Sequence, residues 1–455
     1  MLKIRAGQAL LPEGWARDVT VHVVDGRIAA VEAGGPDAGI SQAVDVLLPA
    51  PANLHSHAFQ RAMSGLTEAR GPDATDSFWT WRRLMFRFLD RLTPDQVQAI
   101  TAFVQMEMLE AGYGASVEFH YLHHQPGGVP YANVAEMSER VAAAAAETGI
   151  GLTLLPVLYQ VGGCDGRPLG PGQVRFGCDL DLYAQVVEGA RKALAGLPDD
   201  ANLGIAPHSL RAVSRDAFPD LPGLGVDGPV HMHLAEQVAE VEEIEAAYGA
   251  RPVDWAMEHL GLDPRWCLIH CTQMTPSETL SLAASGAVAG LCPITESNLG
   301  DGIFDGVRYL EAGGRIGVGS DSNLRISLSE EIRVLDHSQR LRDKGRAMLA
   351  TAEKSTARRI FDEIGQGGAQ AAGRDCGQIA VGAQADLLAL DTDHVDLDGL
   401  HGDTLLDAYV FAADDRRVAE VWSAGRHVVT GGRHVRHDAI TAGYRAALKG
   451  LRDTL

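Results

Sequence analysis

The chain has 455 residues, of which 46% are hydrophobic and 22% are charged, a composition typical of a globular protein. Its net charge of -21, from 39 Lys and Arg against 60 Asp and Glu, argues against nucleic acid and anionic membranes as partners. A chain of this length exceeds one ordinary core, so we expect a large domain plus a smaller one.

The first 48 residues alternate β-rich runs with turn signals. In DVTVHVVDGRIAAVEA, two such runs flank Asp25-Gly26, a dipeptide typical of a tight β-hairpin. The same alternation of β-rich runs and turn residues is found near the C-terminal end, in GQIAVGAQADLLALD and VAEVWSAGRHVVTGGRHV. We therefore predict one small β-sandwich built from 1–48 and 373–440, followed by a C-terminal helix at 441–455. Two unrelated β appendages are the alternative.

The segment 49–372 alternates apolar runs with amphipathic, helix-like ones such as TPDQVQAITAFVQMEMLEAG. The candidate strands are VDVLLPAPANL, ASVEFHYL, GLTLLPVLY, NLGIAPHSL, PVHMHLAE, WCLIHCTQM, AVAGLCPI and RIGVGSDSN. Eight strands, mostly apolar on both faces and separated by helices, predict an α/β fold of the (β/α)8 barrel type. An open doubly wound sheet is the alternative. No GxGxxG motif opens a helix after the first strand, which disfavours a dinucleotide-binding fold.

Polar side chains recur where these predicted strands end. His55 and His57 lie two apart on the first strand, so both point to one face and can share a divalent metal. The other strand-end residues are Tyr121, His208, His233, His270 and Asp321. Each fits a polar loop residue when taken alone. Since the active residues of such barrels lie at the C-terminal ends of the strands, their shared placement indicates one catalytic site.

The cysteines and the N-terminus bear on the compartment. Six cysteines without a CxxC pair are typical of a reduced, cytoplasmic protein. The N-terminal segment lacks the apolar core and small-residue cleavage pattern of a signal peptide. No apolar run approaches the length that spans a membrane.

Several strings resemble a known family. NLHSH, HMHLAE, IHC and GSDSN resemble the amidohydrolase superfamily, and the resemblance covers essentially the whole chain. Within it, NLHSHAFQRAMSGLTE, SFWTWRRLMFR and APHSLRAV resemble the formimidoylglutamate deiminases. The resemblance implies hydrolytic deimination of N-formimidoyl-L-glutamate to N-formyl-L-glutamate and ammonia by a metal-activated water, a step of histidine degradation. It also suggests a homodimer.

The resemblance implies one metal per chain, zinc, held by His55, His57, His233 and Asp321. Binuclear members of the superfamily use a lysine on strand four, and that strand has none here. His231 competes with His233 as a ligand, but Glu236 follows His233 at the HxxE spacing of mononuclear deaminases. Three imidazoles and a carboxylate are also compatible with iron or manganese.

The resemblance assigns the catalytic roles to Glu236, His270 and Asp321. Hydrolytic deamination removes a proton from water and delivers protons to the departing nitrogen, which a carboxyl group beside the metal can do. An imidazole can orient the attacking water and stabilise charge. For Glu236, the alternative is a carboxylate that interacts with the dipole of the helix that follows it.

The residues that match the family's substrate-binding positions are Gln60, Arg82, Tyr121, His208 and Arg211. Arginine holds carboxylates through a planar fork of donors, which would supply the local positive charge that a dicarboxylate needs in an acidic protein. Arg61 and Arg83 could instead be solvated neighbours, and the sequence leaves open which arginine of the Arg82-Arg83 pair faces the substrate. Trp79 and Trp81 could wall the pocket or only pack.

Three questions of function stay open at this point. A deaminase of an aromatic amine, such as a guanine, adenosine or cytosine analogue, could use the same metal site. A barrel without activity, serving as a scaffold, is a more remote alternative, since such scaffolds lose metal ligands. The preference for formimidoyl-glutamate over formimidoyl-aspartate is not readable from the sequence.

Overall fold

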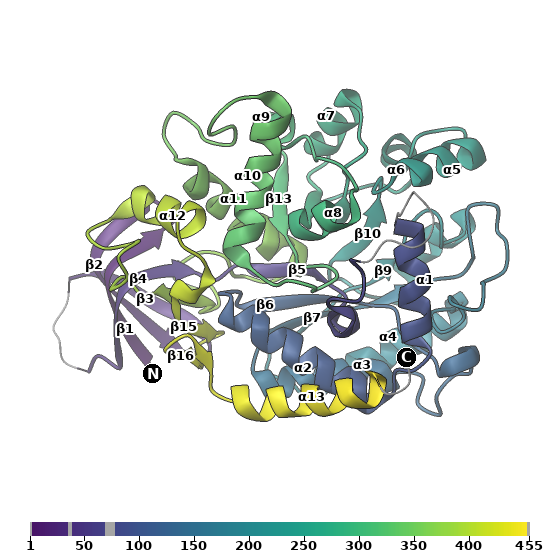
Figure 1. Ribbon diagram of the computed structural model, residues 1–455, viewed down its shortest axis with the longest axis horizontal. Helices are drawn as coiled ribbons and strands as arrows, with labels where there is room; N and C mark the ends of the chain where they lie inside the picture. The colour runs from purple at the N-terminus through teal and green to yellow at the C-terminus, as the bar shows by residue number, and fades with distance from the viewer. Residues whose placement is uncertain (1, 35–38, 69–77, 453–455) are drawn as a thin grey trace.

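The computed structural model describes residues 2–34, 39–68 and 78–452. Figure 1 shows a β-rich lobe at the left, made from both ends of the chain, and a larger barrel at the right. Within the described residues, no helix is long and apolar enough to cross a membrane.

Parallel strands form the barrel in chain order. Their bounds are β5 (Ala52–Ser56), β6 (Ala115–His120), β7 (Gly151–Leu158), β8 (Asn202–Leu203), β9 (Ala206–Pro207), β10 (Val230–Leu234), β11 (Trp266–His270), β12 (Val288–Leu291) and β13 (Arg315–Val318). The short β8 and β9 share the fourth position, since both pair with β7. Bridges Ile205–Val230 and Ser56–Asp321 join the two halves and close the ring. The predicted (β/α)8 barrel is confirmed, and the open sheet is wrong.

Helices surround these strands. Their bounds are α1 (Phe78–Leu89), α2 (Pro94–Glu110), α3 (Glu136–Thr148), α4 (Leu180–Leu194), α5 (Val238–Tyr248), α6 (Pro252–His259), α7 (Pro276–Ala284), α8 (Pro293–Leu299), α9 (Gly306–Glu311), α10 (Leu328–Asp343), α11 (Thr356–Ala372), α12 (Gly402–Phe411) and α13 (His437–Arg452), with 3-10 turns η1 (Ala58–Met63), η2 (Pro126–Gly128), η3 (Arg215–Leu224) and η4 (Asp415–Arg417). Helix α2 begins at a capping box, in which Thr93 and Gln96 satisfy each other's backbone N–H. Helix α3 ends at Gly149, whose φ of 74° few other residues adopt readily.

The β lobe is one sheet with strand order β17-β16-β15-β14-β4-β1-β2-β3. Its strands are β1 (Leu2–Leu11), β2 (Gly14–Val24), β3 (Arg27–Ala33), β4 (Gln42–Pro49), β14 (Leu387–Leu390), β15 (Val418–Ser423), β16 (Arg426–Thr430) and β17 (Arg433–His434). The expected hairpin turns at Asp25-Gly26, both with positive φ, as a two-residue turn requires. A separate apolar core includes Ile4, Val21 and Trp422. The prediction that both termini build one β domain is confirmed, and the two-appendage alternative is wrong.

The first predicted strand, VDVLLPAPANL, is two strands in the structure. Strand β4 ends at Pro49 and pairs within the β lobe, whereas β5 starts at Ala52 in the barrel. Proline has no N–H to donate to a ladder, so Pro49 and Pro51 mark the point where the chain leaves one sheet for the other. This passage sets where β5 starts, and therefore where His55 and His57 lie.

The last helix, α13 (yellow in Figure 1), runs beside α2 and starts four residues before the predicted 441. The rings of Phe103 on α2 and Tyr444 on α13 stack with centroids 3.9 Å apart. The Tyr444 hydroxyl donates to the carbonyl oxygen of Arg61 at 3.3 Å. Helix α13 thus supports η1, the turn that carries Gln60.

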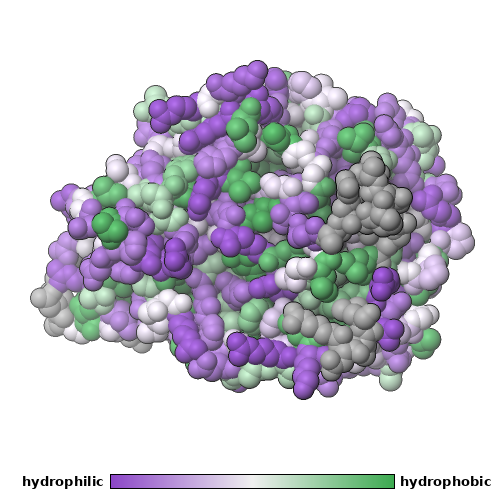
Figure 2. Space-filling model, in the orientation of Figure 1, coloured by the Kyte–Doolittle hydropathy of each residue, from purple (hydrophilic) through white to green (hydrophobic). Residues whose placement is uncertain are grey.

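Hydrophilic residues cover much of the outer surface in Figure 2. Hydrophobic residues show near the middle of this face, between the helices above and those below.

Candidate active site

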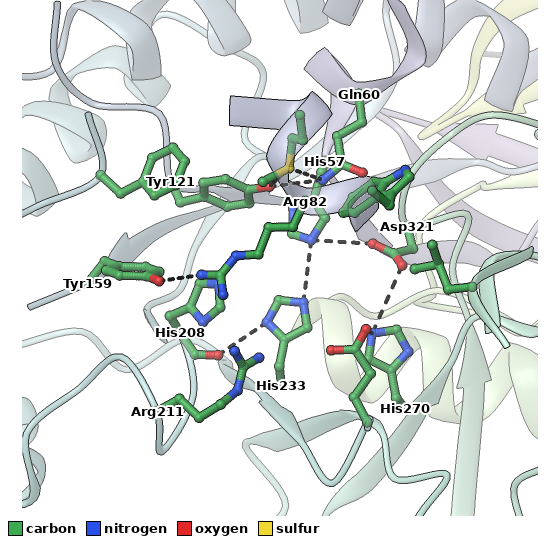
Figure 3. Close-up of a pocket in the computed structure, with 15 residues that line it drawn as sticks. His57, Gln60, Arg82, Tyr121, Tyr159, His208, Arg211, His233, His270 and Asp321 are labelled. Carbon is green, nitrogen blue, oxygen red and sulfur yellow. Dashed lines mark hydrogen bonds and ion pairs between the residues drawn. The ribbon is translucent and has the colours of Figure 1, made fainter. Parts of the chain in front are cut away.

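A pocket of about 520 Å³, its open mouth included, lies at the C-terminal ends of the barrel strands. The residues that line it, most of them labelled in Figure 3, are His57, Gln60, Trp81, Arg82, Met85, Tyr121, Tyr159, Phe176, His208, Arg211, His233, Glu236, His270, Leu299 and Asp321. Every site residue predicted from the sequence is in this set except His55, which is fully buried against the rings of His57 and His233.

Three imidazoles and one carboxylate converge at the floor of the pocket. Oδ1 of Asp321 lies 3.5 Å from Nε2 of His55 and 3.3 Å from Nε2 of His57. Nε2 of His57 lies 3.4 Å from Nε2 of His233. All four side chains are buried, and they come from β5, the residue that follows β5, β10 and the segment after β13. His55, His57 and His233 form a group that could hold a metal ion.

The hydrogen bonds behind these rings fit a bound cation. Nδ1 of His57 donates to the carbonyl oxygen of Phe119 at 3.0 Å, and Nδ1 of His233 donates to that of His208 at 3.2 Å. A carbonyl only accepts, so the proton of each neutral ring is on Nδ1 and its Nε2 presents a lone pair. Two lone pairs that face each other repel unless a cation lies between them.

Burial keeps the three rings neutral, as metal ligands must be. It lowers the pKa of His55 to about 3, and it lowers the pKa values of His57 and His233 as well. His231, the competing ligand, instead makes a 2.8 Å hydrogen bond from Nε2 to the carbonyl oxygen of Ala371 on α11 and does not line the pocket. His233 is therefore the histidine of β10 that faces the cluster.

His270 lies among carboxylates beside this cluster. Its Nε2 is 3.8 Å from Oε1 of Glu236 and 4.0 Å from Oδ2 of Asp321. Its Nδ1 is 3.3 Å from Oε1 of Glu296 on α8. Burial alone would lower the pKa of His270, but the three carboxylates outweigh it and raise this pKa to about 10. The ring is therefore a cation at neutral pH.

At Glu236, unlike at His270, the effect of burial on the pKa outweighs the effect of the neighbouring opposite charges. Burial raises its pKa to about 7, with Glu240 and Asp321 adding to the effect, while His270 and Arg211 oppose it. A carboxyl group with a pKa near neutrality can both accept and donate a proton, which suits a proton shuttle. The backbone N–H of Glu236 donates to Glu240 and its side chain lines the pocket, which favours the proton shuttle over an interaction with the dipole of α5.

Glu296 is a site residue that the sequence did not reveal. It lies one turn inside a helix, in PITES, where a carboxylate usually faces solvent. Its Oε1 also accepts from the backbone N–H of Cys292 at 2.8 Å. Burial raises the pKa of the Cys292 thiol well above its usual value, so this thiol stays protonated. Glu296, held in turn by the backbone N–H of Cys292, thus supports His270.

The substrate side of the pocket holds two arginines. Arg82 donates from Nη2 to the Tyr159 hydroxyl at 2.7 Å, and Arg211 is buried. Gln60 donates to the Tyr121 hydroxyl at 2.9 Å. His208 packs against Tyr159, with ring centroids 4.7 Å apart. The two arginine head groups, Tyr121, Tyr159 and His208 lie on the side of the pocket away from His270, whereas Gln60 lies by His57 (Figure 3).

The structure decides two of the alternatives left by the sequence. Arg61 turns away and pairs with both carboxylate oxygens of Glu107, at 2.6 and 3.0 Å, so it anchors η1. Trp81 lines the pocket. The side chains of Trp79 and Arg83 lie outside the described residues. Sequence reasoning missed Tyr159, Met85 and Phe176, because hydrophobic or aromatic residues in such places look like ordinary core.

Comparisons with known proteins agree with this geometry. Residues 46–428 match the amidohydrolase family, and residues 1–39 match the N-terminal domain of formimidoylglutamate deiminase HutF. A formimidoylglutamate deiminase from Pseudomonas aeruginosa is 45% identical over 456 residues, covering 100% of both chains.

Solved structures extend the match to three dimensions. An amidohydrolase from Brucella melitensis is 45% identical with a TM-score of 0.95, covering 99% of this chain and 100% of the other. A zinc-bound adenosine deaminase from Xanthomonas campestris has a TM-score of 0.82 at 22% identity, covering 100% and 99%, which shows the shared fold. With a match along its whole length and a pocket of the expected residues, the chain belongs to the amidohydrolase family and, within it, to the formimidoylglutamate deiminases.

Proposed function

We propose that the protein hydrolyses N-formimidoyl-L-glutamate to N-formyl-L-glutamate and ammonia, in histidine degradation. One observation carries the proposal: a single pocket joins a histidine–aspartate cluster at its floor to two arginines at its other side. The cluster suits hydrolysis, and the arginines suit a substrate with two carboxylates. The name of the Pseudomonas aeruginosa relative supports the same reaction.

One divalent cation, zinc, would be held by His55, His57, His233 and Asp321. The support is the donor set itself, since neutral imidazoles with one carboxylate are common zinc ligands and leave a position for water. When bound, the cation acts as a Lewis acid and lowers the pKa of a coordinated water toward about 7. A single cation is favoured because the fourth strand, LGIAPHSL, has no lysine that could bridge to a second one.

The chain's own residues would carry the protons. Glu236 would take a proton from the attacking water and deliver it to the imino nitrogen, and would then carry the second proton of the same water oxygen to that nitrogen, which departs as ammonia. His270, held by Glu296, presents its Nε2–H toward Asp321 and Glu236 and stabilises the negative charge that develops on the attacking oxygen. Asp321, whose Oδ1 lies 3.5 Å from Nε2 of His55 and 3.3 Å from Nε2 of His57, would accept a hydrogen bond from the attacking water and keep it oriented.

The second half of the pocket would bind the glutamate moiety. Arg211 and Arg82 each offer a planar set of donors to a carboxylate, and Gln60, Tyr121 and His208 add neutral polar groups nearby. A nucleobase site would instead favour stacking aromatics and amide groups, so the two arginines favour the dicarboxylate over an aromatic amine. A scaffold without activity would have no need of the intact cluster.

The direct test is ammonia release from formimidoyl-glutamate, formimidoyl-aspartate and a panel of aminated bases. We expect the highest kcat/KM with formimidoyl-glutamate. A higher value with any aminated base would overturn the substrate assignment while leaving hydrolysis intact, and no release from any compound would favour the scaffold. From the family resemblance and the six unpaired cysteines we also propose a cytoplasmic homodimer, which sedimentation of the purified protein would test for its subunit number.

A further inference from the structure

The Tyr159 hydroxyl receives two hydrogen bonds whose direction is fixed. It lies at the end of β7, 2% exposed, and lines the pocket. Nη2 of Arg82 lies 2.7 Å from its oxygen, and guanidinium nitrogens only donate. Nε2 of Gln173 lies at the same distance, 2.7 Å.

The amide of Gln173 cannot be turned the other way. Its Oε1 accepts from the backbone N–H of Gly170 at 2.8 Å, so its NH2 group must face Tyr159. The phenolic oxygen therefore accepts from both neighbours. A phenol has one O–H to donate, and among the residues that the structure describes no acceptor takes it from Tyr159.

A buried donor without an acceptor is costly, so this proton points to an acceptor that the chain itself does not supply. The pocket is the space beside it. We infer that Tyr159 is a substrate-binding residue, whose hydroxyl donates to the side-chain carboxylate of the substrate, the carboxylate that Arg82 also pairs with. The inference rests on the proposed function, because it needs a dicarboxylate ligand.

The choice between the two carboxylates follows from their places in the substrate. The α-carboxylate is close to the formimidoyl group, whereas the side-chain carboxylate is the group farthest from it. Tyr159 lies across the pocket from His270 and Asp321 in Figure 3, on the side where the far end of the substrate must be.

Tyr159→Phe removes the hydroxyl and keeps the ring that packs on His208 and Phe176. A hydrogen bond to a charged group is lost, so we expect kcat/KM for formimidoyl-glutamate to fall about 10- to 100-fold, mainly through KM, with metal content unchanged. The matched control is Tyr183→Phe, which also removes a buried hydroxyl beside β7, one that bonds the carbonyl oxygen of Pro156 outside the pocket. It should leave KM unchanged.

Two analogues locate the contact. With N-formimidoyl-L-norvaline, whose side chain ends in methyl, Tyr159→Phe should cost less than about threefold, because the acceptor is gone. With N-formimidoyl-4-aminobutyrate, which lacks the α-carboxylate, the full loss should persist. Equal losses on all three compounds, or a loss that disappears only with the second analogue, would overturn the assignment.

A double variant separates direct donation from an effect through Arg82. If Tyr159 binds the substrate itself, Tyr159→Phe should still lower kcat/KM at least fivefold in an Arg82→Met background, which is the lower part of the range for such a bond. No further loss there would mean that the hydroxyl only orders Arg82. If the wild-type enzyme turns over formimidoyl-glutamate and Tyr159→Phe has the same kcat/KM, this inference alone is wrong. Wild-type enzyme that neither turns over that compound nor binds N-formyl-L-glutamate in calorimetry would defeat the proposed function as well.

Discussion

His270 and Glu296 form a buried pair in which Nδ1 of the imidazole lies 3.3 Å from Oε1 of the carboxylate. The imidazole comes from the end of β11 and the carboxylate from α8. The pair fixes the ring so that the opposite nitrogen, Nε2, faces Glu236 and Asp321. Glu296 is therefore a positioning residue for His270.

Glu296→Gln should shift the basic limb of the activity profile. Several carboxylates raise the pKa of His270 to about 10, and Glu296 is one of them. The amide still accepts from Nδ1 but carries no charge, so the pKa of His270 should fall. If the cationic ring is the active form, kcat/KM then declines at a lower pH than in the wild type. An unchanged basic limb, with a lower rate at every pH, would mean that Glu296 has only a structural part.

Glu236→Gln tests the proton shuttle. The amide keeps the size of the side chain but cannot transfer a proton, a step that typically supplies ~10²–10⁴-fold in rate. We expect turnover to fall by that order while metal content survives, measured by steady-state ammonia release and elemental analysis. Loss of the metal would make Glu236 a ligand instead. A decrease under about tenfold would show that its carboxylate serves the helix that follows rather than the reaction.

Removing the metal tests the cluster at the pocket floor. Purified protein should contain close to one equivalent of divalent metal, and chelation should abolish turnover, with recovery on adding zinc back. The reason is the inward set of Nε2 lone pairs, for which a cation is the fitting partner. Two tightly bound metals per chain, or full activity after stripping, would contradict a single catalytic cation.

The sequence predicted the barrel and most of the pocket because both follow from local patterns. His55 and His57 share a face through strand alternation, and parallel strands in a ring bring their ends together. The role of Glu296 could not be predicted from the sequence, because no pattern in its own helix distinguishes it. It becomes a site residue only because α8 places it beside His270 of β11. Tyr159 was missed for a related reason, since its role depends on the direction of two hydrogen bonds, from Arg82 and from Gln173. Contacts of this kind join distant segments and leave no periodic signal.

Arg211 is expected to determine the preference for a dicarboxylate. It follows β9 by a few residues, lines the pocket and is only 6% exposed. Burial disfavours its charge, but the carboxylates of Glu240 and Glu236 more than compensate and raise its pKa. The guanidinium is thus a fixed cation inside an acidic protein, at the place where an anionic substrate must bind.

Arg211→Met removes that charge and keeps much of the side-chain length. Loss of one partner of a buried charge pair costs roughly 2–5 kcal/mol, partly because the other charge is left unpaired. We therefore expect kcat/KM for formimidoyl-glutamate to fall by about 30-fold to several thousand-fold, at about 1.4 kcal/mol per decade. Metal content and thermal stability should change little. Arg215→Met is the matched control, because Arg215 is four residues away, exposed and packed on the Tyr248 ring outside the pocket.

An analogue whose α-carboxylate is replaced by a neutral amide sharpens this test. If Arg211 pairs with the α-carboxylate, Arg211→Met should lower kcat/KM far less for the amide than for the natural substrate. The reason is that the neutral amide forms no ion pair with Arg211 even in the wild-type enzyme. The ratio of the two losses, measured as kcat/KM, gives the strength of that pair. Equal losses on both compounds would mean that Arg211 shapes the loop after β9 or holds the other carboxylate, and the α-carboxylate would then need a different partner in the pocket.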